Sequence, residues 1–252
     1  MSDEAVSGQA EAPEDEGHSI WALMARALIR PSRAFEWMRE RPRWVWPFIV
    51  ILAAGTIFAL TAAGTPAGRE AQLQSLEAQR EQLGEEMYQQ ALEQINSPLF
   101  RTAGVVIAVI GSLVGGAAAF FLTAIVYHGF IALLGGRESA DYRTALAVTG
   151  FSFLPGAIRS LLQTGAVLFG GVLPAEGLSG ILPRDQILTP MGAFLSRIDL
   201  FVIWGLIIAA VGLATLFKVS RAKAWGVVLG WWALGTLAMM GLALLSGRFM
   251  PG

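Results

Sequence analysis

A pair of oppositely charged residues stands out within the apolar part of this chain. Arg159 lies in the stretch TGFSFLPGAIRSLL, inside a long apolar segment, and Asp199 directly precedes the apolar stretch LFVIWGLIIAA. A charge at membrane depth is costly, so such residues usually pair with each other and mark a pathway or a proton relay. Both residues are expected towards the same side of the membrane, so we predict an Arg159–Asp199 pair. This pair is either a structural clasp between two helices or a site in a small transporter or channel component. One arginine with one aspartate is a sparse set of charges for a transporter, which favours the clasp.

The stretch around Arg159 also contains Pro155, which is followed by Gly156. Proline lacks an N–H and clashes with the carbonyl one turn earlier, so we expect this helix to be broken or kinked at Pro155. In a membrane the freed carbonyls need cover, and Thr149 and Ser152 are close enough in sequence to provide it. Gly150 and Gly156 would let a neighbouring helix approach. We therefore predict that Pro155 and Gly156 face other helices and belong to the region of the charged pair.

The other residues with chemical potential are isolated. His128 is the only histidine after residue 18, and no second histidine or carboxylate cluster completes a metal site around it. A lone histidine of this kind is more often a packed side chain than a ligand. Ser160 has no partner base, and the chain has no cysteine. The sequence therefore predicts no catalytic residue, no cofactor, no metal and no nucleic-acid partner.

The composition predicts an all-α, polytopic membrane helix bundle. The chain has 252 residues, of which 54% are hydrophobic and 15% charged, and its mean hydropathy is +0.56. A soluble domain does not normally have this balance. A membrane-spanning helix needs about 20 apolar residues, which gives five expected spans. They lie near residues 44–64, 103–134, 144–166, 200–217 and 225–247.

The flanking basic residues predict the orientation of these spans. Cytoplasmic flanks carry an excess of lysine and arginine. With the N-terminus inside, eleven basic residues lie on the cytoplasmic side, namely Arg26, Arg30, Arg33, Arg39, Arg41, Arg43, Arg137, Arg143, Lys218, Arg221 and Lys223. Six lie on the other side, namely Arg69, Arg80, Arg101, Arg184, Arg197 and Arg248. We therefore expect a cytoplasmic N-terminus and an external C-terminus.

Three segments outside the spans have their own character. Residues 1–18 contain six acids and no lysine or arginine, and we expect a disordered cytoplasmic tail without a cleaved leader. Residues 19–43 alternate arginine with apolar side chains, which predicts an amphipathic helix on the cytoplasmic surface, broken at Pro31. Its alternative role is only to orient the first span. Residues 65–98 are polar and favour helix, which predicts an external helix packed on the bundle or on a neighbouring copy.

Three stretches together resemble the bacterial Yip (Ypt-interacting protein) domain family of integral membrane proteins. IRPSRAFEWMRERPRWVWPF resembles the entry to its first span, and LLGGRESADYRTALAVTGFSFLPG resembles its middle. IDLFVIWGLIIAAVGLATLFKVSRAKAW resembles its last two spans, with Asp199 opening the fourth and Lys223 near the start of the fifth. The resemblance covers about residues 20–247. It rests on the order and spacing of the three stretches along the chain.

The resemblance implies a five-span membrane domain, here residues 44–247, with a cytoplasmic N-terminus. Eukaryotic relatives of this family bind prenylated small GTPases in vesicle traffic. The short tail and the long polar segment 65–98 depart from the eukaryotic pattern and argue against GTPase binding. The predicted location is the bacterial inner membrane. We expect a non-enzymatic protein that organises a membrane or a protein complex, with the lipid bilayer, a second copy or other membrane proteins as partners. The alternatives are the transporter or channel component and a lipid-handling protein.

Overall fold

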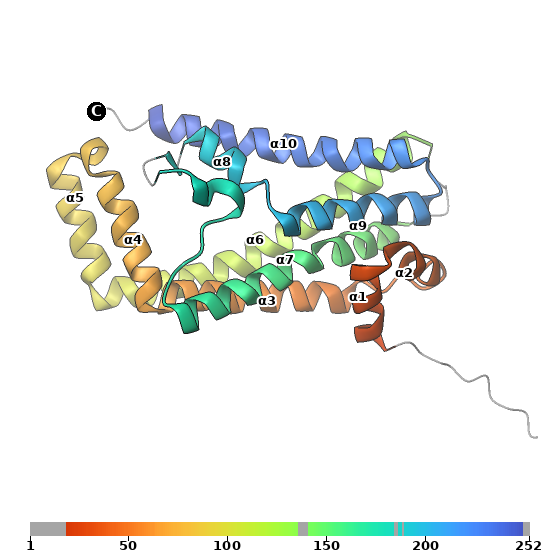
Figure 1. The fold of residues 1–252 in the computed structure, drawn as a ribbon, viewed down its shortest axis with the longest axis horizontal. Coiled ribbons are helices and arrows are strands. Elements are labelled where there is room, and N and C mark those ends of the chain that lie inside the picture. The colour runs from red at the N-terminus through yellow and green to blue at the C-terminus, as the bar shows by residue number, and fades with distance from the viewer. Residues whose placement is uncertain (1–18, 136–140, 184–185, 188, 249–252) are drawn as a thin grey trace, which may run out of the picture.

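The computed structural model is all helical in the part that it describes, residues 19–135, 141–183, 186–187 and 189–248. Five long helices run along the long axis of the molecule (Figure 1). They are α3 (Val45–Gly64), α6 (Pro98–Leu133), α7 (Tyr142–Gly170), α9 (Leu200–Phe217) and α10 (Arg221–Arg248). Each is long and apolar enough to cross a membrane. The predicted fold class and number of spans are confirmed, whereas the acidic tail 1–18 lies outside the described residues.

The centre of the bundle is α7. About 61% of the most apolar 18-residue stretch of α7 is buried, compared with 6% of the corresponding stretch of α6. Its neighbours include α3 on one side and α9 on the other. This difference fits the sequence, because α7 is less apolar than α6 and carries the small and polar residues that helix–helix contacts in a membrane use. The face of α6 that contacts no other helix is therefore left for lipid or for a partner.

Pro155 lies in the buried part of α7 and does not break it. The element is one α-helix from Tyr142 to Gly170, and it ends at Gly171, whose φ of 64° is left-handed. The sequence predicted a broken or kinked helix; the break is absent, and a kink at Pro155 stays a prediction. The carbonyl that proline leaves without its usual partner is that of Phe151, but the Ser152 hydroxyl instead donates to the Thr149 carbonyl at 2.9 Å. The expectation that this hydroxyl covers the freed carbonyl was wrong.

Of the two glycines that flank Pro155, only Gly150 lies close to another helix. A Cβ added at Gly150 would lie 3.1 Å from Cβ of Pro47 and 3.6 Å from the Trp44 carbonyl oxygen. At Gly156 no atom lies within 4 Å of such a Cβ among the described residues. Gly156 therefore does not admit a neighbouring backbone, contrary to the prediction, because it is on a different face of α7 from the contact with α3.

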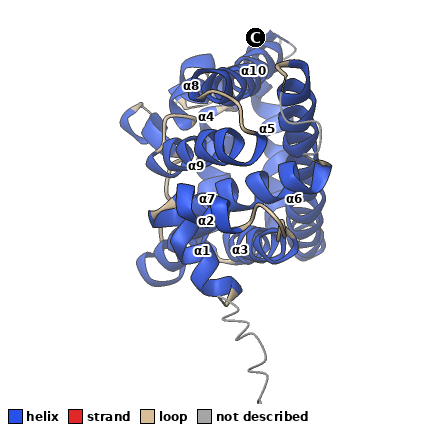
Figure 2. Cartoon of the chain, turned by 90° about the vertical axis from the view of Figure 1, so that its right-hand side faces the viewer, coloured by secondary structure: helices blue, strands red, loops and turns tan. Residues whose placement is uncertain are grey.

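The N-terminal segment forms two short helices that lie across one end of the bundle (Figure 2). These are α1 (Ile20–Ile29) and α2 (Pro31–Trp37), so a new helix starts at Pro31. Their inner faces are part of the main hydrophobic core, where Leu23, Ala27 and Phe35 are all fully or almost fully buried. The sequence predicted a helix resting on the membrane surface. The apolar side of this segment packs on protein and not on lipid, and its position at the membrane surface stays a prediction.

The segment 65–98 forms a helical hairpin at the opposite end of the bundle (Figure 1). Its helices are α4 (Pro66–Ala78) and α5 (Arg80–Asn96), with a non-helical residue at Gly84 near the turn. The prediction of one helix was wrong, since the apolar stripe of this segment is divided between two helices that pack on each other. Ser97 precedes Pro98, the first residue of α6.

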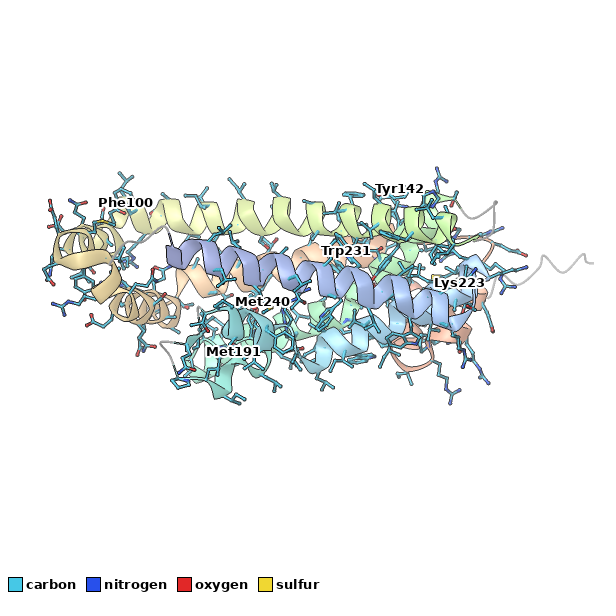
Figure 3. All side chains as sticks on the ribbon, turned by 90° about the horizontal axis from the view of Figure 1, so that it is seen from above. Phe100, Tyr142, Met191, Lys223, Trp231 and Met240 are labelled. Carbon is cyan, nitrogen blue, oxygen red and sulfur yellow. The ribbon has the colours of Figure 1, made fainter. Side chains whose placement is uncertain are left out.

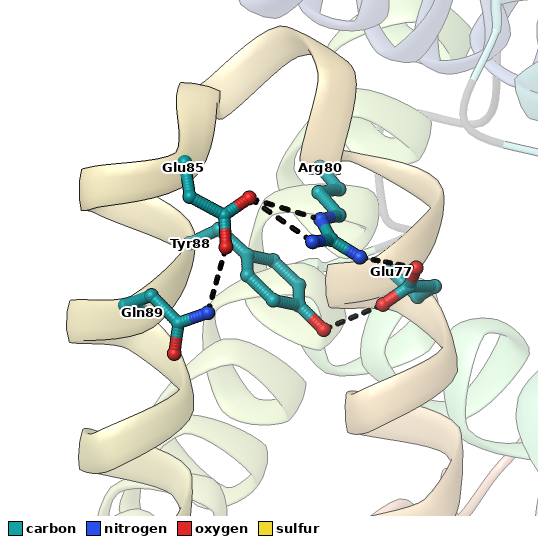
Figure 4. A network of polar contacts seen from close by, with 5 residues as sticks. All are labelled: Glu77, Arg80, Glu85, Tyr88 and Gln89. Atoms are coloured by element: carbon teal, nitrogen blue, oxygen red, sulfur yellow. Dashed lines mark hydrogen bonds and ion pairs between the residues drawn. The ribbon is translucent and has the colours of Figure 1, made fainter.

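The hairpin tip is held by polar side chains of both helices (Figure 4). Arg80 donates to Glu85 at 3.1 Å and to Glu77 at 3.4 Å, and the Tyr88 hydroxyl donates to Glu77. The amide of Gln89 donates to Glu85 at 2.8 Å. The bond from Tyr88 holds the pKa of Glu77 below its ordinary value, and the bond from Gln89 does the same for the pKa of Glu85, with Arg80 adding to both. The tip is therefore ordered by ionised carboxylates.

Lowering the pH is expected to loosen this tip. The pKa values of Glu77 and Glu85 are lower in the folded hairpin than in the unfolded chain, so their contribution is lost as the pH falls through the folded values. The measurement is amide hydrogen exchange at residues 79–88, corrected for the pH dependence of the intrinsic exchange rate. We expect the corrected exchange to be slow near neutral pH and to accelerate below pH 4.5, the ordinary pKa of a glutamate carboxyl. The double variant Glu77→Gln with Glu85→Gln should lose this dependence, and an unchanged pH profile in it would contradict the assignment.

Side-chain hydrogen bonds join α10 to α6 at one end and along the middle of the bundle. Lys223, at the start of α10, lies at the α1–α2 end, and Phe100 lies beside the hairpin (Figure 3). The Lys223 ammonium donates to the Leu134 carbonyl at the end of α6 at 2.7 Å. Along the middle, Trp231 of α10 donates to Thr123 of α6 at 3.1 Å. The first described residue, at the start of α1, and the end of α10 are at opposite ends of the bundle (Figure 1).

Candidate functional site

The candidate site lies where α7 meets the start of α9. The chain between α7 and α9 contains a short 3-10 helix (Gly177–Ile181) and α8 (Pro190–Ser196). The backbone N–H of Leu178 donates to the Ile198 carbonyl at 3.1 Å. Gly177 has a φ of 52°, and a Cβ there would lie 2.7 Å from the Ser196 carbonyl oxygen, so this turn requires glycine. These contacts tie the 3-10 helix to the residues that directly precede α9.

Asp199 is the N-cap of α9. Its Oδ1 accepts hydrogen bonds from the backbone N–H of Phe201 at 2.7 Å and of Val202 at 3.3 Å. Aspartate is a preferred N-cap because its carboxylate satisfies N–H groups that have no partner within the helix. One carboxylate oxygen therefore has a structural role, and the second remains free for another contact.

Arg159 provides that contact from α7. Its Nη1 lies 3.7 Å from Asp199 Oδ2, and the side chains of Arg159 and Asp199 are 25% and 12% exposed. The structure thus brings the two charged residues together, with the buried Pro155 about one turn earlier on α7. At 3.7 Å the contact is electrostatic and longer than a good hydrogen bond.

Arg197 is a third charged residue of this site. The prediction counted it only as a flanking cation, although it lies two residues before Asp199. It directly follows α8, and its Nη2 lies 3.9 Å from where a Cβ would be on Gly235 of α10. Burial lowers the pKa of Arg197, the charge of Arg159 lowers it further, and Glu176 opposes both. The spacing to Asp199 was the available signal, but sequence alone did not place Arg197 against α10.

The two guanidinium groups have donors to spare. The Nε atoms of Arg159 and Arg197 are buried and have no hydrogen-bond partner in the described part of the chain. Buried donors of this kind normally bind an acceptor such as water or an anion. The arrangement can therefore clasp α7 to α9 and can also hold a small acceptor, but it contains no nucleophile with a partner base.

His128 lies on α6, near the start of α7. Its ring contacts the ring of Tyr142 edge to face, with centroids 6.0 Å apart, and its Nδ1 is buried without a partner among the described residues. No group of three or more His, Asp or Glu side chains that could hold a metal ion is found in the described part of the chain. The position thus fits a packed histidine.

The variant Asp199→Asn separates the charge of Asp199 from its capping role. Asparagine keeps an oxygen for the N–H groups of Phe201 and Val202 but leaves Arg159 without its counter-charge. For a clasp we expect the free energy of unfolding to fall by about 1–3 kcal/mol, seen as lower abundance and a lower melting temperature in detergent. Asp199→Ala should lose about 0.5–2 kcal/mol more, because the cap is lost as well. Loss of ion flux at normal abundance and stability would contradict the clasp.

Comparisons with known proteins agree on a membrane family. The model of the Yip1 domain matches residues 25–242. The chain is 28% identical over 202 residues to the "Membrane protein YknW" of Bacillus subtilis (strain 168), an alignment that covers 79% of this chain and 80% of that protein. No solved structure matches the chain.

Proposed function

Because the chain belongs to the Yip1 domain family, we propose that it is a non-enzymatic membrane protein that organises a membrane or a protein complex. The observation that carries this proposal is the α4–α5 hairpin, which extends beyond the spanning helices instead of covering them (Figure 1). A folded extension with an ordered tip is suited to contact another protein. Met87, on its second helix, is an exposed apolar residue among polar ones.

The proposed location is the bacterial inner membrane, with the α1–α2 end in the cytoplasm and the hairpin outside. The larger number of lysine and arginine residues at the α1–α2 end supports this orientation. Reporter enzymes that are active on only one side of the membrane, fused to each terminus of the full chain, test it. A C-terminal reporter that is active only in the cytoplasm would overturn the orientation.

The organising role is tested by affinity purification in a mild detergent. The full chain should retain reproducible partner proteins, and the variant Met87→Glu on the hairpin should lose them. Ser32→Glu is the matched control, because it adds the same charge at an exposed position of α2 on the opposite end. Capture of the same proteins by Met87→Glu would remove the hairpin from the interface. Capture of none by the unaltered chain would remove the organising role.

A second candidate is a small transporter or channel component with its site at Pro155, Arg159 and Asp199. The Nε–H groups of Arg159 and Arg197, which have no partner among the described residues, favour it, since they can donate hydrogen bonds to an anionic or polar solute. In that case Asp199→Asn changes flux without changing abundance. The same variant therefore decides between this role and the clasp.

A further inference from the structure

A groove on α1 and α2 concentrates positive charge at one end of the bundle. It has a volume of about 590 Å³ and is lined by three arginines, Arg26, Arg30 and Arg33, with Ile29 and Trp37 beside them. All three arginines are exposed. No acidic residue lines the groove.

Within the described residues, no carboxylate neutralises the charges of this groove. No ion pair joins Arg26, Arg30 or Arg33 to a carboxylate in the part of the chain that the structure describes. Three guanidinium groups around one groove repel each other, and an anion between them would relieve that repulsion. Arginine matches the oxygens of a phosphate with two parallel N–H donors.

The groove is also held in place by the core below it. Leu23 and Ala34 line the groove and are themselves buried in the hydrophobic core. The indole N–H of Trp204 on α9 donates to the Leu28 carbonyl near the end of α1 at 3.0 Å. The arginines therefore project from a backbone that is already ordered, which lowers the entropic cost of binding.

We propose that this groove binds the phosphate headgroup of one anionic phospholipid. The apolar part of the groove favours a lipid over free phosphate, because Ile29 is 78% exposed and would contact the glycerol and the start of an acyl chain. The inference deepens the proposed function, since a lipid-filled groove anchors the α1–α2 end, and it rests on the placement of that end at the membrane surface. Cytoplasmic leaflets supply anionic headgroups, which attract each nearby arginine.

The test measures binding of a fluorescent short-chain phosphatidylglycerol to the full chain in a neutral detergent at physiological ionic strength. We expect one site, with phosphatidylcholine binding much more weakly. The triple variant Arg26→Gln, Arg30→Gln, Arg33→Gln should bind on the order of a hundredfold more weakly. The control variant Arg143→Gln, Lys218→Gln, Arg221→Gln removes the same charge from exposed positions outside the groove. It should bind about as well as the unaltered chain, because these residues do not line the groove and salt screens exposed charges.

Several outcomes would overturn the proposal. The full chain could show no saturable binding of phosphatidylglycerol, or both triple variants could bind it equally weakly. Inorganic phosphate could also displace the lipid when it is present at the same concentration as the lipid. The same measurement is made on a full-length variant in which the six acids of residues 1–18 are neutralised. If only that variant bound phosphatidylglycerol, the acidic segment and not a lipid would be the occupant.

The melting temperature of each lipid-free variant shows whether it folds, and substitution of exposed arginines should leave it unchanged. If the full chain bound no lipid but still retained partners that Met87→Glu lost, only the lipid inference would fail. If lipid bound and no partner was retained, only the organising role would fail.

Discussion

Phe35→Ala is expected to lower the free energy of unfolding by about 3–5 kcal/mol, the range for a buried phenylalanine. Phe35 on α2 is completely buried, and its ring meets that of Phe151 on α7 edge to face, with centroids 6.1 Å apart. Its other side lies against Gly212 of α9. The ring therefore joins α2 to α7 and α9, and alanine would leave a cavity that these helices cannot fill without moving.

Unfolding of the purified protein in detergent, followed by heat or denaturant, measures this effect. Phe169→Ala is the matched control, because Phe169 on α7 is 92% exposed and loses few protein contacts. We expect the control to stay within about 0.5 kcal/mol of the unaltered chain. Equal losses in both variants would mean that α1 and α2 do not pack on the bundle as described, and the lipid groove would lose its support as well.

Gly205→Ala is expected to destabilise the contact between α7 and α9 by about 1–3 kcal/mol. A Cβ on Gly205 would lie 2.6 Å from the Ser152 carbonyl oxygen, which is a backbone atom and cannot rotate away. The two helices would have to separate, and the Arg159–Asp199 contact between them would lengthen. The variant should therefore also move the charged pair apart.

Gly165→Ala is the control for this substitution. A Cβ on Gly165 of α7 has no atom within 4 Å among the described residues. Alanine favours helix over glycine by up to about 1 kcal/mol, so we expect this variant to be neutral or slightly more stable. Melting temperatures of the two variants in the same detergent give the comparison. A Gly205→Ala variant as stable as Gly165→Ala would show that α7 and α9 are not in backbone contact.

Much of the fold could be predicted from short stretches of the sequence. The five spans follow from hydropathy, because about 20 apolar residues in a row are needed and are easily recognised. The start of a helix after Asp199 follows from the capping preference of aspartate. The Arg159–Asp199 contact followed from the cost of placing a charge in a membrane. Each of these properties depends on residues that are close in sequence or on the bilayer itself.

Other features were decided only by tertiary structure. An apolar helix face can contact lipid or protein equally well, so the apolar residues around Phe35 were expected to face lipid although they pack in the core. The same ambiguity hid the hairpin, in which a stripe expected to face the bundle or a second copy is divided between two helices that pack on each other. Gly150, Gly156 and Gly205 look alike in the sequence, yet only Gly150 and Gly205 lie close to another helix. Which face of a helix meets a neighbour depends on how all the helices pack. For this reason only the structure identified Arg197 as a residue of the site.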